Sequence, residues 1–208
     1  MHRVTSNRAL LQLISERVRQ GRIIQGWTLD QLSEKSGVSR RTIVNVEKGS
    51  LNPGIVTLLR LSDALGIGLP SLVGAHLSQS TKVVRAGHGA VLWESTFGGH
   101  GVLVGGIEPP DVVELWDWTL GPGDHYQSEA HVPGTHELLQ VLDGEIVVRV
   151  ADEAYCLRTG DALTFSSDVD HSYSNTTEGP ASFSLAVFEP GVGKAHRTEI
   201  DNDANTDS

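Results

Sequence analysis

The 208-residue sequence predicts two small domains of different classes, an all-α domain followed by an all-β domain. Apolar residues recur at helical spacing over residues 7–74, whereas short alternating runs broken by Gly, Pro, Asp and Asn begin at residue 82. Charge changes at the same place: residues 1–80 hold ten Lys/Arg and five Asp/Glu, and residues 81–208 hold six and twenty-one. We therefore expect domains at 7–74 and 82–192, joined by a linker at 75–81.

Five helices are expected in the first domain, and the first of them covers residues 7–25. Its inner stripe is formed by Leu10, Ile14, Val18 and Ile23. Asn52 caps the fourth helix, with Pro53 in the favoured first-turn position, and Gly66 ends it. A short fifth helix follows over residues 69–73.

The most informative segment is residues 28–49, TLDQLSEKSGVSRRTIVNVEKG, which predicts the second and third helices joined by a tight turn. Thr28 caps the first of this pair, with Gln31 in the capping-box position. Gly37 supplies the left-handed turn residue, and Ser39 caps the helix that follows. The segment is therefore expected to form a compact helical hairpin.

On the second helix of this hairpin, Ile43 and Val46 are expected to point inward. The outward positions are Arg40, Arg41, Val44, Asn45 and Lys48. Arginine can make a forked pair of hydrogen bonds to guanine and asparagine to adenine, so this face suits the major groove of DNA. The alternative is an ordinary helical hairpin with a charged solvent face.

The five-helix pattern resembles the lambda-repressor-like, or XRE, helix-turn-helix family over residues 7–74. Its markers here are QGWT at 25–28, LS at 32–33, GVS at 37–39, Ile43 and EKG at 47–49. The resemblance implies that Arg40, Arg41 and Asn45 read bases, that Thr28 meets a phosphate, and that Arg22 pairs with Glu47. The expected DNA-binding residues are Thr28, Ser39, Arg40, Arg41, Thr42, Asn45 and Lys48. Leu29 departs from the polar residue of several relatives.

The second domain is predicted to be a sandwich or barrel of short strands. The expected strands are 91–95, 101–105, 112–120, 138–142, 145–150, 154–157, 162–165, 171–175 and 182–188. The Asp143-Gly144 pair predicts a hairpin turn. Cys156, the only cysteine, is expected to be a buried small residue of a strand rather than a redox switch.

Two segments of this domain resemble the two motifs of the cupin family, a double-stranded β-helix or jelly roll, over residues 84–190. The first runs from Gly121 through PGTHE at 133–137 to Gly144, and the second from Leu157 through Gly160 to Asn175. In metal-binding cupins three histidines and one glutamate hold a divalent ion. By position, His131, Glu137 and His171 match three of these ligands, whereas the fourth falls on Pro133.

Two histidines and a carboxylate could still hold zinc, iron or nickel with open coordination positions, although no cofactor is certain. The alternative is a pocket in which His131, Glu137 and His171 hydrogen-bond an organic ligand without metal. Neighbouring histidines are poorer candidates. His136 is expected on the opposite strand face from Glu137, and His125 in an exposed loop.

The two resemblances together imply a bacterial transcription-factor architecture rather than an enzyme. We expect a homodimer that binds double-stranded operator DNA, acts as a repressor, and carries a cupin domain that senses a small-molecule effector, supports dimerisation, or both. The main rival is a metal-dependent, dioxygenase-like cupin enzyme with a DNA-binding appendage. A further rival is an antitoxin-like protein that binds a partner through its acidic half.

No apolar run approaches the length needed to cross a bilayer, so a cytoplasmic protein without a membrane partner is expected. The last residues, 193–208, are rich in Asp and Asn and lack an apolar pattern. They are expected to form a disordered acidic tail.

Overall fold

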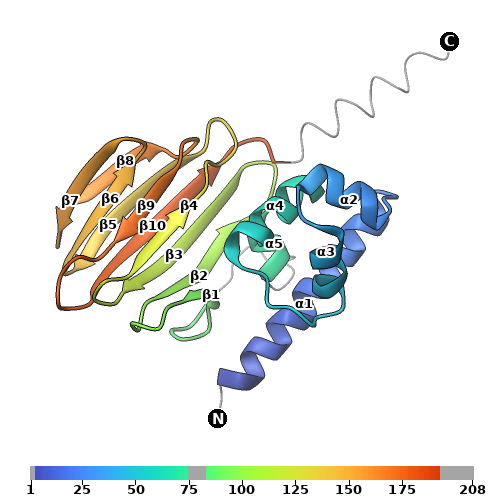
Figure 1. Cartoon of the computed structure of the whole chain (residues 1–208), viewed down its shortest axis with the longest axis horizontal. Coiled ribbons are helices and arrows are strands. Elements are labelled where there is room, and N and C mark those ends of the chain that lie inside the picture. The colour runs from blue at the N-terminus through green and yellow to red at the C-terminus, as the bar shows by residue number, and fades with distance from the viewer. Residues whose placement is uncertain (1–2, 75–82, 193–208) are drawn as a thin grey trace. The chain divides into compact units, whose positions relative to one another are not determined.

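The computed structural model describes residues 3–74 and 83–192, and these form a helical amino-terminal unit and a β-rich carboxy-terminal unit (Figure 1). The predicted two-domain layout is therefore confirmed. The linker predicted at 75–81 and the tail predicted at 193–208 lie outside the described residues. Among the described helices, none is both long enough and apolar enough to span a membrane.

Within its described residues, the helical unit has five helices: α1 (Arg3–Ile24), α2 (Leu29–Ser36), α3 (Arg40–Glu47), α4 (Ile55–Leu65) and α5 (Leu69–Val73). Every helix contributes apolar side chains to one core. The buried residues include Ile14, Val18, Leu32, Ile43, Val46, Leu58, Leu61 and Leu72. Burial of Ile43 and Val46 anchors one side of α3 in this core and leaves its other side facing away.

Two expectations for the helices are wrong in detail. Ile23 is 57% exposed and does not belong to the inner stripe of α1. Counting by four from Val18 leads to Arg22, which takes the inward position because a helix repeats every 3.6 residues. Helix α4 begins at Ile55 with Gly54 as its cap, because the chain remains extended through Gly54. The predicted cap at Asn52 is therefore not used, and Pro53 is buried in the preceding loop.

The β-rich unit contains two antiparallel sheets. Its strands are β1 (Ala90–Glu94), β2 (His100–Ile107), β3 (Val112–Leu120), β4 (His125–Ser128), β5 (His136–Asp143), β6 (Glu145–Val150), β7 (Glu153–Arg158), β8 (Ala162–Ser166), β9 (His171–Ser174) and β10 (Ala181–Glu189). One sheet has the order β1-β2-β3-β10-β5-β8 and the other β4-β9-β6-β7. Tyr173 of the smaller sheet stacks on Trp118 and Phe183 of the larger sheet, so the inner faces pack together.

Two expectations for the strands and turns are corrected by the structure. His125 is exposed, as expected, but it lies in strand β4 rather than in a loop. The Asp143-Gly144 turn does not form a hairpin, because it joins β5 of one sheet to β6 of the other. Gly144 has a φ of +79°, and a Cβ there would lie 2.9 Å from the Cα of Ala181, so the crossing needs glycine.

Cys156 is exposed rather than buried. It lies in β7, which forms an edge of the four-stranded sheet, and almost every residue of this strand is exposed. In this edge strand exposure does not alternate between residues, so the burial on which the prediction depended is absent.

Candidate functional site

The hairpin of α2 and α3 is held by its helix caps. Thr28 accepts a hydrogen bond from the backbone N–H of Gln31 at 3.2 Å, and the Gln31 side chain accepts one from the N–H of Thr28 at 2.8 Å. Gly37 follows with a φ of +66°. Ser39 is the N-terminal cap of α3, and its Oγ accepts a hydrogen bond from the N–H of Thr42 at 3.1 Å. The capping box and both caps predicted from the sequence are confirmed.

An ion pair fixes α3 against α1. Arg22 Nε lies 2.7 Å from Glu47 Oε1, and Arg22 Nη2 lies 2.9 Å from Glu47 Oε2, with both side chains mostly buried. Arg22 also donates to the carbonyl oxygen of Trp27 at 3.0 Å. The hydrogen bond with Glu47 raises the pKa of Arg22 despite the opposing effect of burial. The two-bond geometry sets the orientation of α3 as well as its position.

Glu47→Ala should destabilise the helical unit by about 2 kcal/mol, because it leaves the mostly buried Arg22 guanidinium without its partner. Urea unfolding followed by circular dichroism measures this loss. Asp30→Ala is the matched control, since it removes the exposed Arg40–Asp30 pair, and it should cost under about 1 kcal/mol. Equal destabilisation by both substitutions would contradict the anchoring role of Glu47.

The outward side of α3 presents the positive groups predicted for DNA contact. Arg41 and Lys48 are exposed, and Asn45 is half-buried. Arg40 is exposed, and its Nε lies 2.9 Å from Asp30 Oδ1 of α2. This pair is too solvated to hold Arg40 firmly, so the guanidinium can exchange it for a nucleic-acid partner.

The remaining predicted contacts lie at helix starts. The hydroxyl oxygens of Thr28 and Ser39 are used in the caps, and Ser39 Oγ lies 2.8 Å from Thr42 Oγ1. A backbone phosphate could meet the amide groups of these helix N-termini, where the helix dipole favours an anion. Sequence-predicted DNA residues are thus gathered at the α2–α3 hairpin.

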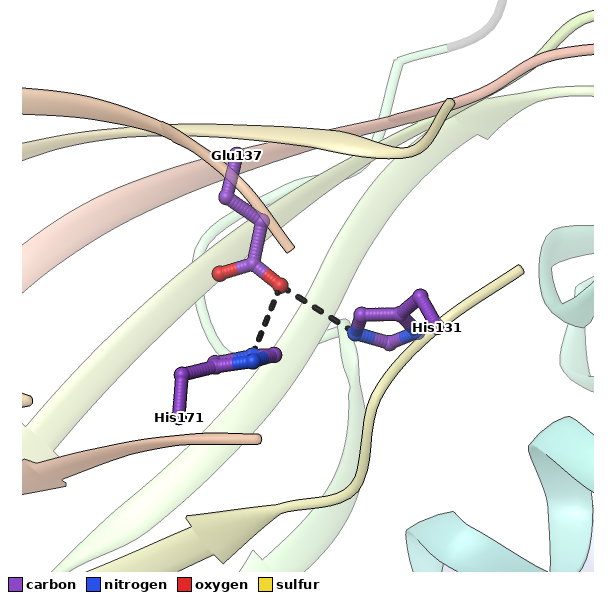
Figure 2. A group of neighbouring side chains, drawn as sticks. All are labelled: His131, Glu137 and His171. Atoms are coloured by element: carbon purple, nitrogen blue, oxygen red, sulfur yellow. Dashed lines mark ion pairs between the residues drawn. The ribbon is translucent and has the colours of Figure 1, made fainter. Parts of the chain in front are cut away.

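The second site lies between the two sheets of the β-rich unit. His131 comes from the loop before β5, Glu137 from β5, and His171 from the start of β9 (Figure 2). His131 Nε2 and His171 Nε2 each lie 3.1 Å from Glu137 Oε1. The three ligand atoms all lie within 4.8 Å of one another. Donors bound to one metal at about 2.1 Å are separated by about 3 to 3.5 Å, so the two separations from Glu137 Oε1 suit a divalent ion, and the two histidines would move slightly toward each other to bind it.

Backbone hydrogen bonds place the loop histidine. The N–H of His131 donates to the carbonyl oxygen of Ser167 at 2.9 Å. The N–H of Ser167 in turn donates to the carbonyl oxygen of Thr135 at 3.0 Å. Pro133, at the position where the cupin motif has its second histidine, is exposed and has no donor atom in its side chain. His136 is also exposed, on the opposite face of β5 from the buried Glu137, as predicted.

The protonation of His171 decides how it faces the carboxylate of Glu137. Val169 O lies 2.8 Å from His171 Nδ1, and this acceptor assigns a proton to Nδ1. In neutral His171 the Nε2 lone pair would then face the carboxylate oxygen of Glu137. Glu137 Oε1, 3.1 Å from the buried Nε2, can accept a hydrogen bond from this nitrogen only when Nε2 carries a proton. A proton or a metal ion on Nε2 removes this repulsion.

The ionisation of the cluster favours a positive charge beside Glu137. Burial alone would raise the pKa of Glu137, but hydrogen bonds and charge from His131 and His171 outweigh it and lower the pKa to about 2. Burial would lower the pKa of His171, and its contacts with Glu137 outweigh this and raise it. The carboxylate is therefore ionised, and a cation beside it is stabilised.

Tyr173 is the member of this site that sequence reasoning missed as a partner of Glu137. It is fully buried, and its hydroxyl donates a hydrogen bond to Glu137 Oε2. Burial first, and then the charge and hydrogen bond of Glu137, raise the pKa of Tyr173 well above its ordinary value, so it remains a donor. Tyr173 thereby occupies one carboxylate oxygen and leaves Oε1 to face the two histidines.

Comparisons with known proteins match both units. Residues 18–72 match the helix-turn-helix family model and residues 116–188 match the cupin domain model. The HTH-type transcriptional regulator SutR of Escherichia coli (strain K12) is 25% identical over 181 residues, which cover 87% of this chain and 97% of SutR. An uncharacterized HTH-type transcriptional regulator of Methanothermobacter thermautotrophicus is 39% identical over 49 residues, covering 24% of this chain and 71% of that protein.

One solved structure is similar along nearly its whole length. The crystal structure of an HTH_3 family transcriptional regulator from Vibrio cholerae has a TM-score of 0.69 and 21% sequence identity. The similarity covers 88% of this chain and 99% of that one, and it supports the fold.

Proposed function

Because this chain belongs to the XRE-type helix-turn-helix transcriptional regulators that carry a cupin domain, we propose that it binds a two-fold-related operator as a homodimer and represses transcription. In this proposal α3 enters the major groove, and the β-rich unit, a cupin jelly roll, senses a small molecule. Repression is the simplest consequence, because a protein that occupies an operator blocks access to it.

The placement of α3 is the observation that carries the proposal. Ile43 and Val46 are buried on one side, and Arg40 and Arg41 are exposed on the other. The Arg22–Glu47 pair holds this orientation without using any of the outward residues. One small helical module contacts few base pairs, so sequence specificity requires a second copy on an adjacent half-site.

Selection of bound duplexes from a randomised pool tests the proposal. With the 208-residue chain, the enriched sequences should contain two inverted half-sites whose centres lie about 10 base pairs, or a multiple of that, apart. Binding of every sequence with equal affinity would contradict specific operator recognition. A single half-site without a partner would contradict the dimer.

We infer that His131, Glu137 and His171 hold a divalent metal, with zinc, iron and nickel as the candidates. The support is the convergence of three donor atoms, with both histidine Nε2 atoms 3.1 Å from Glu137 Oε1, on an ionised carboxylate whose charge a metal ion would balance. Such an ion would supply open coordination positions that an effector could bind. The effector would alter DNA affinity only if it binds the DNA-competent form with a different affinity from the other form.

Two histidines and one carboxylate also favour a second candidate function, a metal-dependent oxygenase-type enzyme. Oxygen uptake measured on the iron-loaded protein with small carboxylic acids separates the two. A compound that changes operator affinity without oxygen uptake supports the sensor. Catalytic oxygen uptake together with loss of the compound supports the enzyme.

A further inference from the structure

An acidic side chain lies among the positive groups of the α2–α3 hairpin. Asp30 belongs to the first turn of α2, and its Oδ1 lies 2.9 Å from Nε of Arg40, the first residue of α3. The turn between the two helices therefore brings their first turns together. A carboxylate is unexpected on a surface that is to meet DNA, because it repels phosphate.

Stability does not account for this contact. The side chain of Asp30 is 77% exposed and that of Arg40 is 59% exposed, so water screens the attraction between them. Asp30 also suits the positive end of the helix dipole of α2, but an acid at any position of that turn would do the same. The placement of Asp30 beside Arg40 therefore points to a role in DNA binding.

The contact uses one edge of the Arg40 guanidinium. Nε faces Asp30, whereas the two Nη groups lie at the end of the side chain. These Nη groups can make the forked pair of bonds to guanine O6 and N7, so Arg40 can read a base without leaving Asp30. When the groove displaces water from the pair, the attraction between its charges becomes stronger. Asp30 then holds the guanidinium in one orientation while it is bound.

Contacts with phosphate depend on charge in a way that contacts with guanine do not. A cation beside the DNA backbone releases counterions, and the affinity gained is independent of sequence. Guanine O6 and N7 are uncharged acceptors, which need donors in the correct geometry. Beside Asp30, Arg40 keeps its donors but has little net charge to offer to phosphate. The pair thus weakens binding to unrelated DNA more than binding to the operator.

We infer that Asp30 is a specificity-determining residue, which positions Arg40 for a base and cancels its charge toward phosphate. Specificity is a difference between two affinities, so a lower affinity for unrelated sequences increases it. Asp30 has this role only if Arg40 reads a base, so the inference rests on the proposed function. Helix α2 thereby takes part in operator selection as well as supporting α3.

Titration of fluorescent operator and scrambled duplexes with the 208-residue chain, repeated over a range of salt concentrations, tests this role. At about 50 mM salt, Asp30→Asn should raise the affinity for the scrambled duplex about 5-fold and that for the operator less than about 2-fold. The gain on the scrambled duplex should shrink about 3-fold by about 200 mM salt. The reason is that one added phosphate contact steepens the salt dependence by a slope of about 0.9.

Glu34→Gln is the matched control, since Glu34 is another exposed acid of α2. It should change both affinities by the same factor and leave their ratio as in wild type. A double-mutant comparison identifies the group through which Asp30 acts. Asp30→Asn should lower the ratio in an Arg41→Ala background but leave it unchanged in an Arg40→Ala background.

The outcomes separate this role from operator recognition itself. If wild type does not distinguish the two duplexes, operator recognition and the role of Asp30 both fail. If wild type distinguishes them and Asp30→Asn does so equally well, only the role of Asp30 is overturned. A loss of specificity that persists in the Arg40→Ala background would also overturn it, because Asp30 would then act without Arg40. Thermal melts by circular dichroism verify that each variant is folded.

Discussion

Replacing both Arg40 and Arg41 with Ala is expected to lower the affinity for the selected operator by at least about 30-fold. Each forked contact between an arginine and guanine contributes about 1 to 3 kcal/mol of discrimination, and two such losses combine. Affinity for unrelated DNA should fall much less, because it depends on phosphate contacts made by other groups. Titration of fluorescent operator and scrambled duplexes at one fixed salt concentration measures both quantities.

The folded state should tolerate this double substitution. Both arginines are exposed, and the Arg40–Asp30 pair is solvated on both sides, so its removal costs under about 1 kcal/mol. Arg85→Ala with Arg149→Ala is the matched control, since it removes two exposed arginines from the β-rich unit. Retention of operator specificity by the Arg40/Arg41 variant would show that α3 does not read the bases.

The second large effect is expected at the histidine–glutamate cluster. Glu137→Gln should lower the affinity for a divalent ion by more than about 100-fold, because the amide keeps the shape of the side chain but loses the charge that both histidines face. Competition between the protein and a chromophoric chelator, with zinc as the probe, measures this. Wild type is expected to bind one ion per chain.

Substitutions around Glu137 should give a graded series. Tyr173→Phe removes the hydrogen bond that fixes Glu137 Oε2, and loss of such a supporting bond should weaken zinc binding about 10-fold. His136→Ala is the control, since His136 is the next residue along the chain but is exposed on the opposite face. Equal zinc affinity in wild type and Glu137→Gln would exclude this cluster as the metal site.

The helical unit could be predicted well because its signals are local. The capping box at Thr28, the left-handed turn at Gly37 and the cap at Ser39 are each set within a few residues. The inward position of Arg22 departs from the apolar pattern of the helix, because its charge is paired with Glu47 on another helix. That partner came from family resemblance and not from spacing alone.

The β-rich unit is harder to predict from the sequence, because its contacts join segments that are far apart along the chain. His131, Glu137 and His171 come from a loop and two strands of different sheets, so no spacing rule unites them, and the cupin motif alone named them together. The hydrogen bond from Tyr173 to Glu137 joins strands of different sheets, so it depends on how the two sheets pack, which the sequence does not specify. The exposure of Cys156 likewise depends on β7 being an edge strand.

Methylation interference at guanine N7 of the selected operator tests most directly whether α3 reads the major groove. Methyl groups at N7 should block binding of wild type at two clusters of guanines whose centres lie about one helical turn apart. The Arg40→Ala/Arg41→Ala variant should lose this pattern in whatever binding remains. Wild-type binding that is indifferent to N7 methylation throughout the site would contradict recognition by this helix.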